Sequence, residues 1–445
     1  MTHVLVYGLA VAGEAVAHAL RRRSIPFSVA DDQPTDHARA LAASWGVDLA
    51  EAPDPHSLDD LVACSDLVVP APGVPETHAL FEHCRQRQVE VCSEIELAYR
   101  WEQDRPGGPR PMLAITGTDG KTTTTELTAA ILTTAGHRTR AVGNTDAPLI
   151  SVIDDDLDAF VVECSSFRLT FTERFRAEGS AWLNLAEDHQ NWHRDLPSYI
   201  GAKARLWQAL RPDDVAVGPV DDPVVRRHLD AVGARRITVG LDAGDYRVAA
   251  GRLTGPGGDI ARVDELARAL PHDLTNGLTA AALAMETGLA GADHVAATLR
   301  TFTAPRHRIE LVAEGGGVRW FDDSKATTPH AALTAVAAFP SLVWIAGGRN
   351  KGLDLTVLAH GADHVRAVVA LGEAADEVMA AFAGQRPVER AGTMAEAVRL
   401  AAILARPGDA VVLSPACASY DAYRNYGERG DDFVRCVREH LGEQS

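Results

Sequence analysis

Seven residues at 116–122, Thr-Gly-Thr-Asp-Gly-Lys-Thr, combine the side chains and the backbone freedom that bind a triphosphate. An apolar run precedes them and a helical pattern follows, so the expected order is strand, glycine loop and helix. Gly117 and Gly120 let the loop turn its N–H groups inward, while the helix N-terminus and Lys121 add positive charge. Thr122 adds a hydroxyl suited to Mg²⁺. The stretch predicts a phosphate-binding loop; the alternative is an ordinary turn with a surface lysine.

Two later apolar runs also end in side chains that could serve a magnesium–nucleotide site. Glu163 follows the run at 158–162, and Asp188-His189 follow the run at 180–186. Since the carboxyl ends of parallel strands share one edge of a sheet, we expect these groups near the glycine loop. A carboxylate there suits Mg²⁺–ATP. Lys203, on a helical pattern at 196–210, is by itself typical of a solvated surface lysine.

Residues 3–32 predict the first strand–helix–strand unit of a Rossmann-like sheet. Gly8 ends the first strand, and Asp31 ends the second where an acid could hold a ribose hydroxyl. Ala10 stands where the dinucleotide fingerprint has its middle glycine, which disfavours NAD. Another strand at 67–71 ends in a turn at Gly73. The pattern fits either a ligand-binding edge or a unit that only builds a sheet.

The last third of the chain repeats the alternation of strands and helices. Apolar runs at 318–322, 342–346, 367–371 and 410–414 are separated by helical patterns, which predicts a second parallel sheet with covering helices. Polar residues follow these runs, namely Asp323, Lys325, Lys351 and the stretch 414–419. They can meet at one edge of that sheet.

Composition limits the class of protein. A chain of 445 residues exceeds a single hydrophobic core, and 46% hydrophobic with 23% charged residues is typical of a soluble globular protein. The net charge of -18 disfavours nucleic acid and anionic membranes as partners. Six cysteines without a CxxC pair, and no apolar run long enough for a membrane span, predict a cytoplasmic protein. The Pro- and Gly-rich stretch 103–111 is typical of a linker.

Four motifs together resemble those of the Mur ligases of peptidoglycan synthesis. They are the loop at 116–122, Glu-Cys-Ser-Ser-Phe at 163–167, the stretch 184–189 and Tyr-Ile-Gly-Ala-Lys at 199–203. The resemblance covers nearly the whole chain except about 213–270. It implies an α/β fold of three domains: a Rossmann-like UDP-sugar domain at 1–108, a P-loop ATPase-like parallel sheet at 109–304, and a Rossmann-like amino-acid domain at 305–445.

The resemblance is strongest to members that join D-glutamate to UDP-N-acetylmuramoyl-L-alanine. It implies that ATP phosphorylates the alanyl carboxylate and that glutamate then attacks the acyl phosphate. It also implies two Mg²⁺ ions and a monomer, whereas the expectation of no nucleic-acid or membrane partner comes from the net charge. The member that adds L-glutamate remains an alternative, because Asp119, Arg168 and Asp273 depart from the usual motifs. A folate-type glutamate ligase lacks the N-terminal unit, and a nucleotide sensor without catalysis would not need the full set of catalytic residues.

The resemblance assigns roles to individual residues. The implied catalytic residues are Lys121, Glu163, His189 and Lys203, with Lys203 carrying a carbamate. The implied metal contacts are Thr122, Glu163, His189 and Lys203. The implied ATP contacts are Gly117, Thr118, Asp119, Gly120, Lys121, Thr122, Thr123, Asn276, Arg308 and Asp323. The predicted substrate contacts, which include the N-terminal strand ends described above, are Gly8, Ala10, Asp31, Gly73, Asn144, Ser165, Lys325, Thr327, Lys351, Ser419 and Tyr426.

Overall fold

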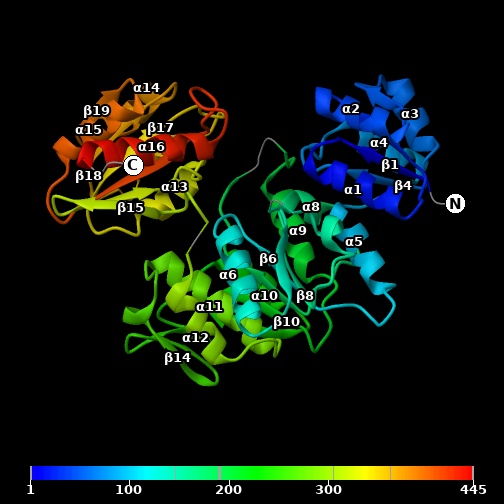
Figure 1. The fold of residues 1–445 in the computed structure, drawn as a ribbon, viewed down its shortest axis with the longest axis horizontal. Helices are drawn as coiled ribbons and strands as arrows, with labels where there is room; N and C mark the ends of the chain where they lie inside the picture. The colour runs from blue at the N-terminus through cyan, green and yellow to red at the C-terminus, as the bar shows by residue number, and fades with distance from the viewer. Residues whose placement is uncertain (1–2, 146, 189–191, 304, 361, 443–445) are drawn as a thin grey trace. The chain divides into compact units, whose positions relative to one another are not determined.

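The computed structural model describes residues 3–145, 147–188, 192–303, 305–360 and 362–442. The chain forms two compact units, one of residues 1–269 and 273–302 and the other of residues 270–272 and 303–445. The first unit holds two parallel sheets and a small antiparallel one, and the second holds one mixed sheet (Figure 1). The α/β class and the three larger sheets agree with the sequence prediction. The exact boundaries at 108/109 and 304/305 stay predictions.

The N-terminal sheet has five parallel strands in the order β3-β2-β1-β4-β5. Its strands are β1 (Val4–Tyr7), β2 (Phe27–Asp31), β3 (Leu49–Glu51), β4 (Leu67–Pro70) and β5 (Glu90–Val91). Its helices are α1 (Val11–Arg22), α2 (Asp36–Trp45), α3 (Pro55–Ala63), α4 (Ala79–Arg87) and α5 (Glu94–Gln103). All four residues of β1 and of β4 are buried, as expected for the inner strands of a parallel sheet covered by helices.

The central sheet has six parallel strands in the order β11-β10-β9-β6-β8-β7. They are β6 (Met112–Thr116), β7 (Thr139–Gly143), β8 (Ala159–Glu163), β9 (Gly179–Trp182), β10 (Val215–Pro219) and β11 (Arg235–Val239). β6 lies between β8 and β9, with Ile115 opposite Glu163 and Thr116 opposite Trp182. The strands named in the sequence prediction therefore end side by side.

Helices on and around this sheet set the positions of its loops. They are α6 (Lys121–Thr134), α7 (Leu149–Val152), α8 (Ser166–Thr170), α9 (Leu196–Ala204), η1 (Arg205–Trp207), α10 (Pro223–Asp230), η2 (Val263–Glu265), α11 (Pro271–Glu286) and α12 (Ala292–Thr301). α6, α11 and α12 lie together and share one hydrophobic core with the sheet (Figure 1). The stretch 213–270, which carried no recognisable motif, forms β10, β11 and a small antiparallel sheet of β12 (Arg247–Ala249), β13 (Arg252–Gly255) and β14 (Gly258–Arg262).

The second unit contains a six-stranded sheet in the order β15-β16-β20-β17-β18-β19, parallel except for β15 against β16. Its strands are β15 (Glu310–Gly315), β16 (Val318–Asp322), β17 (Leu342–Gly347), β18 (Val365–Leu371), β19 (Val388–Ala391) and β20 (Ala410–Ala416). Its helices are α13 (Pro329–Val336), η3 (Thr356–Ala359), α14 (Ala375–Ala381), α15 (Met394–Leu404) and α16 (Tyr426–Leu441). Hydrophobic cores lie on both faces of the sheet, as the alternating pattern predicted.

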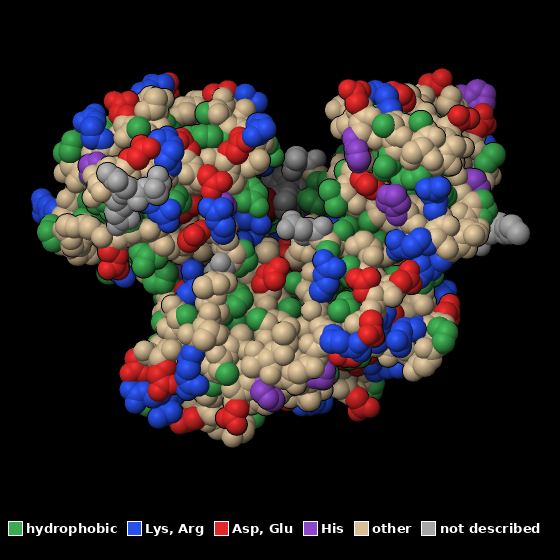
Figure 2. Space-filling model, viewed as in Figure 1, with side chains coloured by type: hydrophobic (Ala, Val, Ile, Leu, Met, Phe, Trp, Pro, Cys, Tyr) green, Lys and Arg blue, Asp and Glu red, His purple; other side chains and the backbone are tan. Residues whose placement is uncertain are grey.

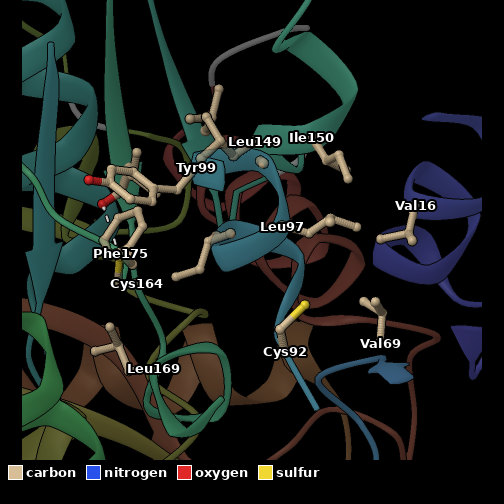
Figure 3. Close-up of a cluster of buried hydrophobic side chains, with 14 of the residues drawn as sticks. Val16, Val69, Cys92, Leu97, Tyr99, Leu149, Ile150, Cys164, Leu169 and Phe175 are labelled. Atoms are coloured by element: carbon tan, nitrogen blue, oxygen red, sulfur yellow. Dashed lines mark hydrogen bonds between the residues drawn. The ribbon is translucent and has the colours of Figure 1, made fainter. Parts of the chain in front are cut away.

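Helix α5 ties the N-terminal sheet to the central one. Its Leu97 and Tyr99 point into a buried cluster with Ile150 and Phe175, and Val16 of α1 lies on the other side of the same cluster (Figure 3). The predicted linker that follows α5 is firmly anchored, because buried Arg110 bonds Glu102 at 2.7 Å and two backbone carbonyls beyond α7, those of Ile153 and Asp155. The segment connects the two sheets without leaving the compact unit.

The described surface carries both signs of charge. Lys and Arg side chains alternate with Asp and Glu over the visible face (Figure 2). None of the described helices has the length and apolar character to cross a membrane.

Candidate active site

The glycine loop joins β6 to α6 with the geometry that a phosphate-binding loop needs. Gly120 has φ +81°, in the left-handed region, and a Cβ there would lie 2.8 Å from Oδ1 of Asn276. Only glycine fits such a position without strain. α6 begins at Lys121 without a side-chain cap from the described residues, whereas Asp195 caps α9. The positive end of α6 therefore faces the loop.

Asn184, which follows β9, holds the loop in shape. Its Oδ1 accepts hydrogen bonds from the backbone N–H groups of Thr118 and Asp119, both at 2.9 Å. Its Nδ2 donates to the carbonyl oxygen of Asp119 at 3.2 Å. The Thr118 hydroxyl is 3.0 Å from the Tyr199 hydroxyl and accepts from the N–H of Ala186. Thr118 thus serves the loop's own structure in this state.

Two lysines converge on the loop from different helices. Lys121 Nζ donates to the carbonyl oxygens of Gly117 at 2.9 Å and of Thr118 at 2.8 Å. Lys203 Nζ, on α9, donates to the same Gly117 oxygen at 2.6 Å. Lys203 is only 1% exposed, and burial, reinforced by the charge of Lys121, holds its pKa well below the usual value for lysine. It is a buried amine and not a solvated surface group.

Glu163 closes the site from β8. It is 1% exposed, and its Oε1 accepts from Asn144 Nδ2 at 3.0 Å. Its other oxygen, Oε2, is buried and has no hydrogen-bond partner among the described residues. The turn after β7 fits closely against this residue, since a Cβ on Gly143 would lie 2.4 Å from the Glu163 carbonyl oxygen.

These residues fit a hard divalent cation. A buried carboxylate oxygen without a partner is costly, and an oxygen-seeking ion such as Mg²⁺ removes that cost. Thr122 supplies a hydroxyl in the first turn of α6, the helix that follows β6, and β6 lies next to β8. His189, the other side chain predicted to hold metal, lies outside the described residues.

Asn276 also lies against the loop. Its Oδ1 accepts from the Thr124 hydroxyl of α6 at 3.1 Å, next to Gly120. Thr123, like Asn276, is largely buried. Asp273 pairs with Arg268 at 2.9 Å, so this acid has a protein partner of its own.

The N-terminal sheet places its predicted ligand residues at one edge. Gly8, with φ +91°, and Ala10 lie between β1 and α1, and Gly73 follows β4. Asp31, predicted to hold a ribose hydroxyl, accepts hydrogen bonds from the backbone N–H groups of Leu9 and Gln33 at 2.7 and 2.9 Å. The bond from Leu9 joins the loop after β1 to the end of β2.

Asp32, which the sequence interpretation did not single out, is the more exposed acid at this edge. Its oxygens contact the Tyr7 hydroxyl at 2.6 Å and His78 Nε2 at 3.1 Å. The sequence signal that could have singled out Asp32 was its position directly after the end of a predicted strand.

The second unit gathers its predicted ATP residues around the end of β16. Asp323 is buried, its N–H donates to Leu413 of β20, and its Oδ2 accepts from Ser414 Oγ at 2.7 Å. Burial raises the pKa of Asp323 to about 8, although Ser414 and the nearby charge of Arg308 act against that rise. Arg308 lies between two non-glycine residues with positive φ, His307 at +63° and Ile309 at +48°.

The residues predicted to bind the amino acid lie in the same unit. Lys325 Nζ is 5.0 Å from the ring centre of Tyr426, and Thr327 follows in the loop before α13. Lys351 is exposed on the loop after β17. Backbone hydrogen bonds between Arg349 and Ala418 bring that loop beside Ser419, which is 2% exposed.

Comparison with known proteins identifies the relatives of this fold and site. Residues 115–269 match the Mur ligase middle domain, and residues 307–417 match the Mur ligase, glutamate ligase domain. A UDP-N-acetylmuramoylalanine–D-glutamate ligase of Frankia casuarinae is 41% identical, over 99% of this chain and 94% of the relative. The chain belongs to the Mur ligase family. The enzyme of the same name from Streptomyces coelicolor is 37% identical over 98% of both chains.

Solved Mur ligases share the fold at low sequence identity. The UDP-N-acetylmuramate–alanine ligase of Thermotoga maritima superposes with a TM-score of 0.59 at 16% identity and covers 99% of this chain and 100% of its own. A MurF ligase of the same organism, in complex with ADP, gives 0.60 at 15% identity over 85% of this chain and 96% of its own. The three-domain Mur ligase fold expected from the motifs is confirmed.

Proposed function

We propose that this Mur ligase adds D-glutamate to UDP-N-acetylmuramoyl-L-alanine with the conversion of ATP to ADP. The observation that carries the proposal is the high identity, over nearly the whole chain, to ligases named for this reaction. The convergence of Lys121, Glu163 and Lys203 at one strand edge gives that identity a chemical basis. The reaction is a step of peptidoglycan precursor synthesis.

The first half of the reaction activates a carboxylate. An oxygen of the alanyl carboxylate attacks the γ-phosphorus of ATP, ADP leaves, and an acyl phosphate forms. The glycine loop and Lys121 hold the phosphate oxygens, because backbone N–H groups and an ammonium are suited to anions. When bound, Mg²⁺ neutralises charge on the phosphates. Glu163 and Thr122 would hold that ion, and fixed donors stabilise charge as it develops in the transition state.

Lys203 carries a carbamate in this proposal. Its depressed pKa favours the neutral amine, whose lone pair can attack the carbon of CO₂. One C=O electron pair moves to oxygen, and the nitrogen loses a proton to solvent. The product is an anion close to Lys121, so a cation beside a neutral amine becomes a cation beside an anion. A carboxylate on a long stem can also contact a divalent ion.

The second half forms the amide. Lys325, Lys351, Thr327, Ser419 and Tyr426 are the proposed contacts of glutamate, since a dicarboxylate needs cations and hydroxyl donors. Its amine attacks the acyl carbon, phosphate leaves, and the nitrogen loses a proton. Holding the amine beside the acyl phosphate removes a large entropic part of the barrier, about 7–11 kcal/mol in well-oriented systems.

The proposal is tested with purified protein, UDP-N-acetylmuramoyl-L-alanine, ATP, Mg²⁺ and each glutamate enantiomer separately. We expect ADP and a product one glutamate heavier with D-glutamate only. Product with L-glutamate alone would transfer the assignment to the L-glutamate-adding member. Absence of ADP with both enantiomers would contradict ligase activity.

A further inference from the structure

Four side chains form one hydrogen-bonded chain from helix α5 to the end of β8. Arg168 Nε donates to Glu94 at 3.4 Å, and Arg168 Nη1 donates to Asn144 Oδ1 at 2.7 Å. Asn144 Nδ2 then donates to Glu163 Oε1 at 3.0 Å. Glu94, Arg168 and Glu163 are at most 6% exposed, so water competes little for these bonds.

The chemistry of the end groups fixes the orientation of the amide between them. A guanidinium has no acceptor and a carboxylate has no donor. Asn144 must therefore turn its oxygen to Arg168 and its nitrogen to Glu163. The backbone reinforces this arrangement, because the Asn144 N–H also donates to the Glu163 carbonyl oxygen at 2.9 Å.

This orientation of Asn144 makes the two carboxylate oxygens of Glu163 unequal. Asn144 occupies Oε1, which leaves Oε2 as the buried oxygen without a partner among the described residues. One oxygen is thus committed to the protein and the other is presented for a cation. Without Arg168 the amide would lose the group that fixes its orientation, and the carboxylate could rotate.

We propose that Arg168 is a positioning residue that orients Glu163 through Asn144, so that the carboxylate would hold a divalent cation. The inference rests on the proposed function, since it names Arg168 as the residue that supports the metal site of that reaction. Sequence reasoning noted Arg168 only as a departure from the family motif. In the structure, Arg168 has a hydrogen-bond partner on each side, Glu94 and Asn144.

Arg168 is itself held from two directions. It lies on α8, whose N-cap is Ser165. Glu94 receives a second bond, from the Ile150 N–H at 2.7 Å, which fixes the carboxylate that Arg168 contacts. Glu94 begins α5, and Ile150 belongs to the buried cluster around that helix, with Leu97 pointing inward beside Ile150 (Figure 3). The hydrogen-bonded chain of side chains therefore begins at a carboxylate that the protein holds in place.

The test measures Mn²⁺ binding, as a Mg²⁺ substitute, by electron paramagnetic resonance on full-length protein with β,γ-methylene ATP. Loss of a residue that orients a metal ligand typically lowers the affinity for the metal about 10–100-fold. Arg168→Met should raise the Mn²⁺ dissociation constant at least about 10-fold, within that range. Asn144→Ala should do the same. In the double variant, Arg168→Met should raise the Mn²⁺ dissociation constant less than about twofold above that of Asn144→Ala alone. The two effects are not additive because both residues act through one contact.

Arg176→Met is the matched control. Arg176 pairs with Asp214, which is 2% exposed, but Arg176 precedes β9 and so lies at the opposite end of the strands from Glu163. It should lower thermal stability without changing Mn²⁺ affinity. If Arg168→Met does not fold, Glu94→Gln with Arg168→Met removes both buried charges and takes its place.

Each outcome bears on the inference. Wild-type Mn²⁺ affinity in a folded Arg168→Met protein would overturn it, and so would effects of Arg168→Met and Asn144→Ala that multiply in the double variant. A wild-type protein that binds no Mn²⁺ would contradict the proposed metal site itself. A matching rise in the Mg²⁺ concentration for half-maximal ligation by Arg168→Met, with the control unchanged, would support the inference.

Discussion

Lys121 and Lys203 donate to one acceptor, the carbonyl oxygen of Gly117, at 2.9 and 2.6 Å. Burial lowers the pKa of Lys203, and the neighbouring positive charge of Lys121 lowers that pKa further. The loop is thus prepared for anionic groups. A triphosphate would meet Lys121, and CO₂ would meet an amine at Lys203.

The first prediction concerns Lys203. Lys203→Met should lower kcat at least about 100-fold, because it removes a group that manages charge at the transferring phosphate. Protein equilibrated with ¹³C-bicarbonate should show a carbamate carbon resonance that Lys203→Met lacks. The sequence has only four lysines, Lys121, Lys203, Lys325 and Lys351, which keeps that assignment simple. Full activity of Lys203→Met would rule out the proposed role.

The second prediction concerns Asn184. Asn184→Ala leaves the N–H groups of Thr118 and Asp119 without their acceptor, which costs about 1–3 kcal/mol per buried group. ATP should bind more weakly, as measured by calorimetry. Asn184→Asp keeps the acceptor oxygen and should bind ATP more tightly than Asn184→Ala does. Equal affinity of the two variants would show that these bonds do not shape the loop.

The third prediction concerns the turn at Gly143. This residue has φ +98°, and a Cβ would meet the Glu163 carbonyl oxygen at 2.4 Å. Gly143→Ala must move the turn away from Glu163 and so should weaken metal-dependent ligation. Gly136→Ala is the control, because Gly136 also has positive φ but a Cβ there meets nothing within 4 Å. Equal ligation rates in the two variants would contradict the close fit.

The fourth prediction concerns pH. Because burial raises the pKa of Asp323 to about 8, from about 3.8 in the unfolded chain, the folded protein holds this proton more tightly. Stability from that proton is fully present below about pH 4 and is lost as pH rises towards 8, by at most about 1.4 kcal/mol per pH unit.

Asp323→Asn cannot ionise and lacks this dependence. The urea midpoint of the wild type, without nucleotide, should therefore fall relative to that of Asp323→Asn as pH rises from 4 to 8. A constant difference between the two midpoints over this range would show that Asp323 is ionised throughout.

Much of the fold could be predicted because local patterns coincide with tertiary structure. The strand, glycine loop and helix around Lys121 are contiguous in sequence, so spacing alone indicated them. Glu163 was predictable for a related reason, because an apolar run delivers it to a strand end. The alternation of strands and helices likewise indicated the sheet of the second unit.

Other features depend on contacts that no local pattern encodes. Lys203 has the sequence surroundings of a surface lysine, and only the approach of α9 to the loop buries it. The chain from Glu94 to Glu163 joins residues that are 74, 24 and 19 positions apart. Asp31 was predicted to hold a ribose hydroxyl, and no local pattern indicated that its oxygens accept from the backbone N–H groups of Leu9, in the loop after β1, and of Gln33. Side-chain partners, unlike element type, had to come from the structure.

Amide formation in the proposed reaction depends on phosphorylation of the alanyl carboxylate by ATP. UDP-N-acetylmuramoyl-L-alanine labelled with ¹⁸O in both carboxylate oxygens tests it directly, through the mass of the inorganic phosphate released during ligation with D-glutamate. One ¹⁸O atom is expected in each phosphate, since an alanyl oxygen stays on phosphorus when the amine attacks. Phosphate released without ¹⁸O would contradict that phosphorylation.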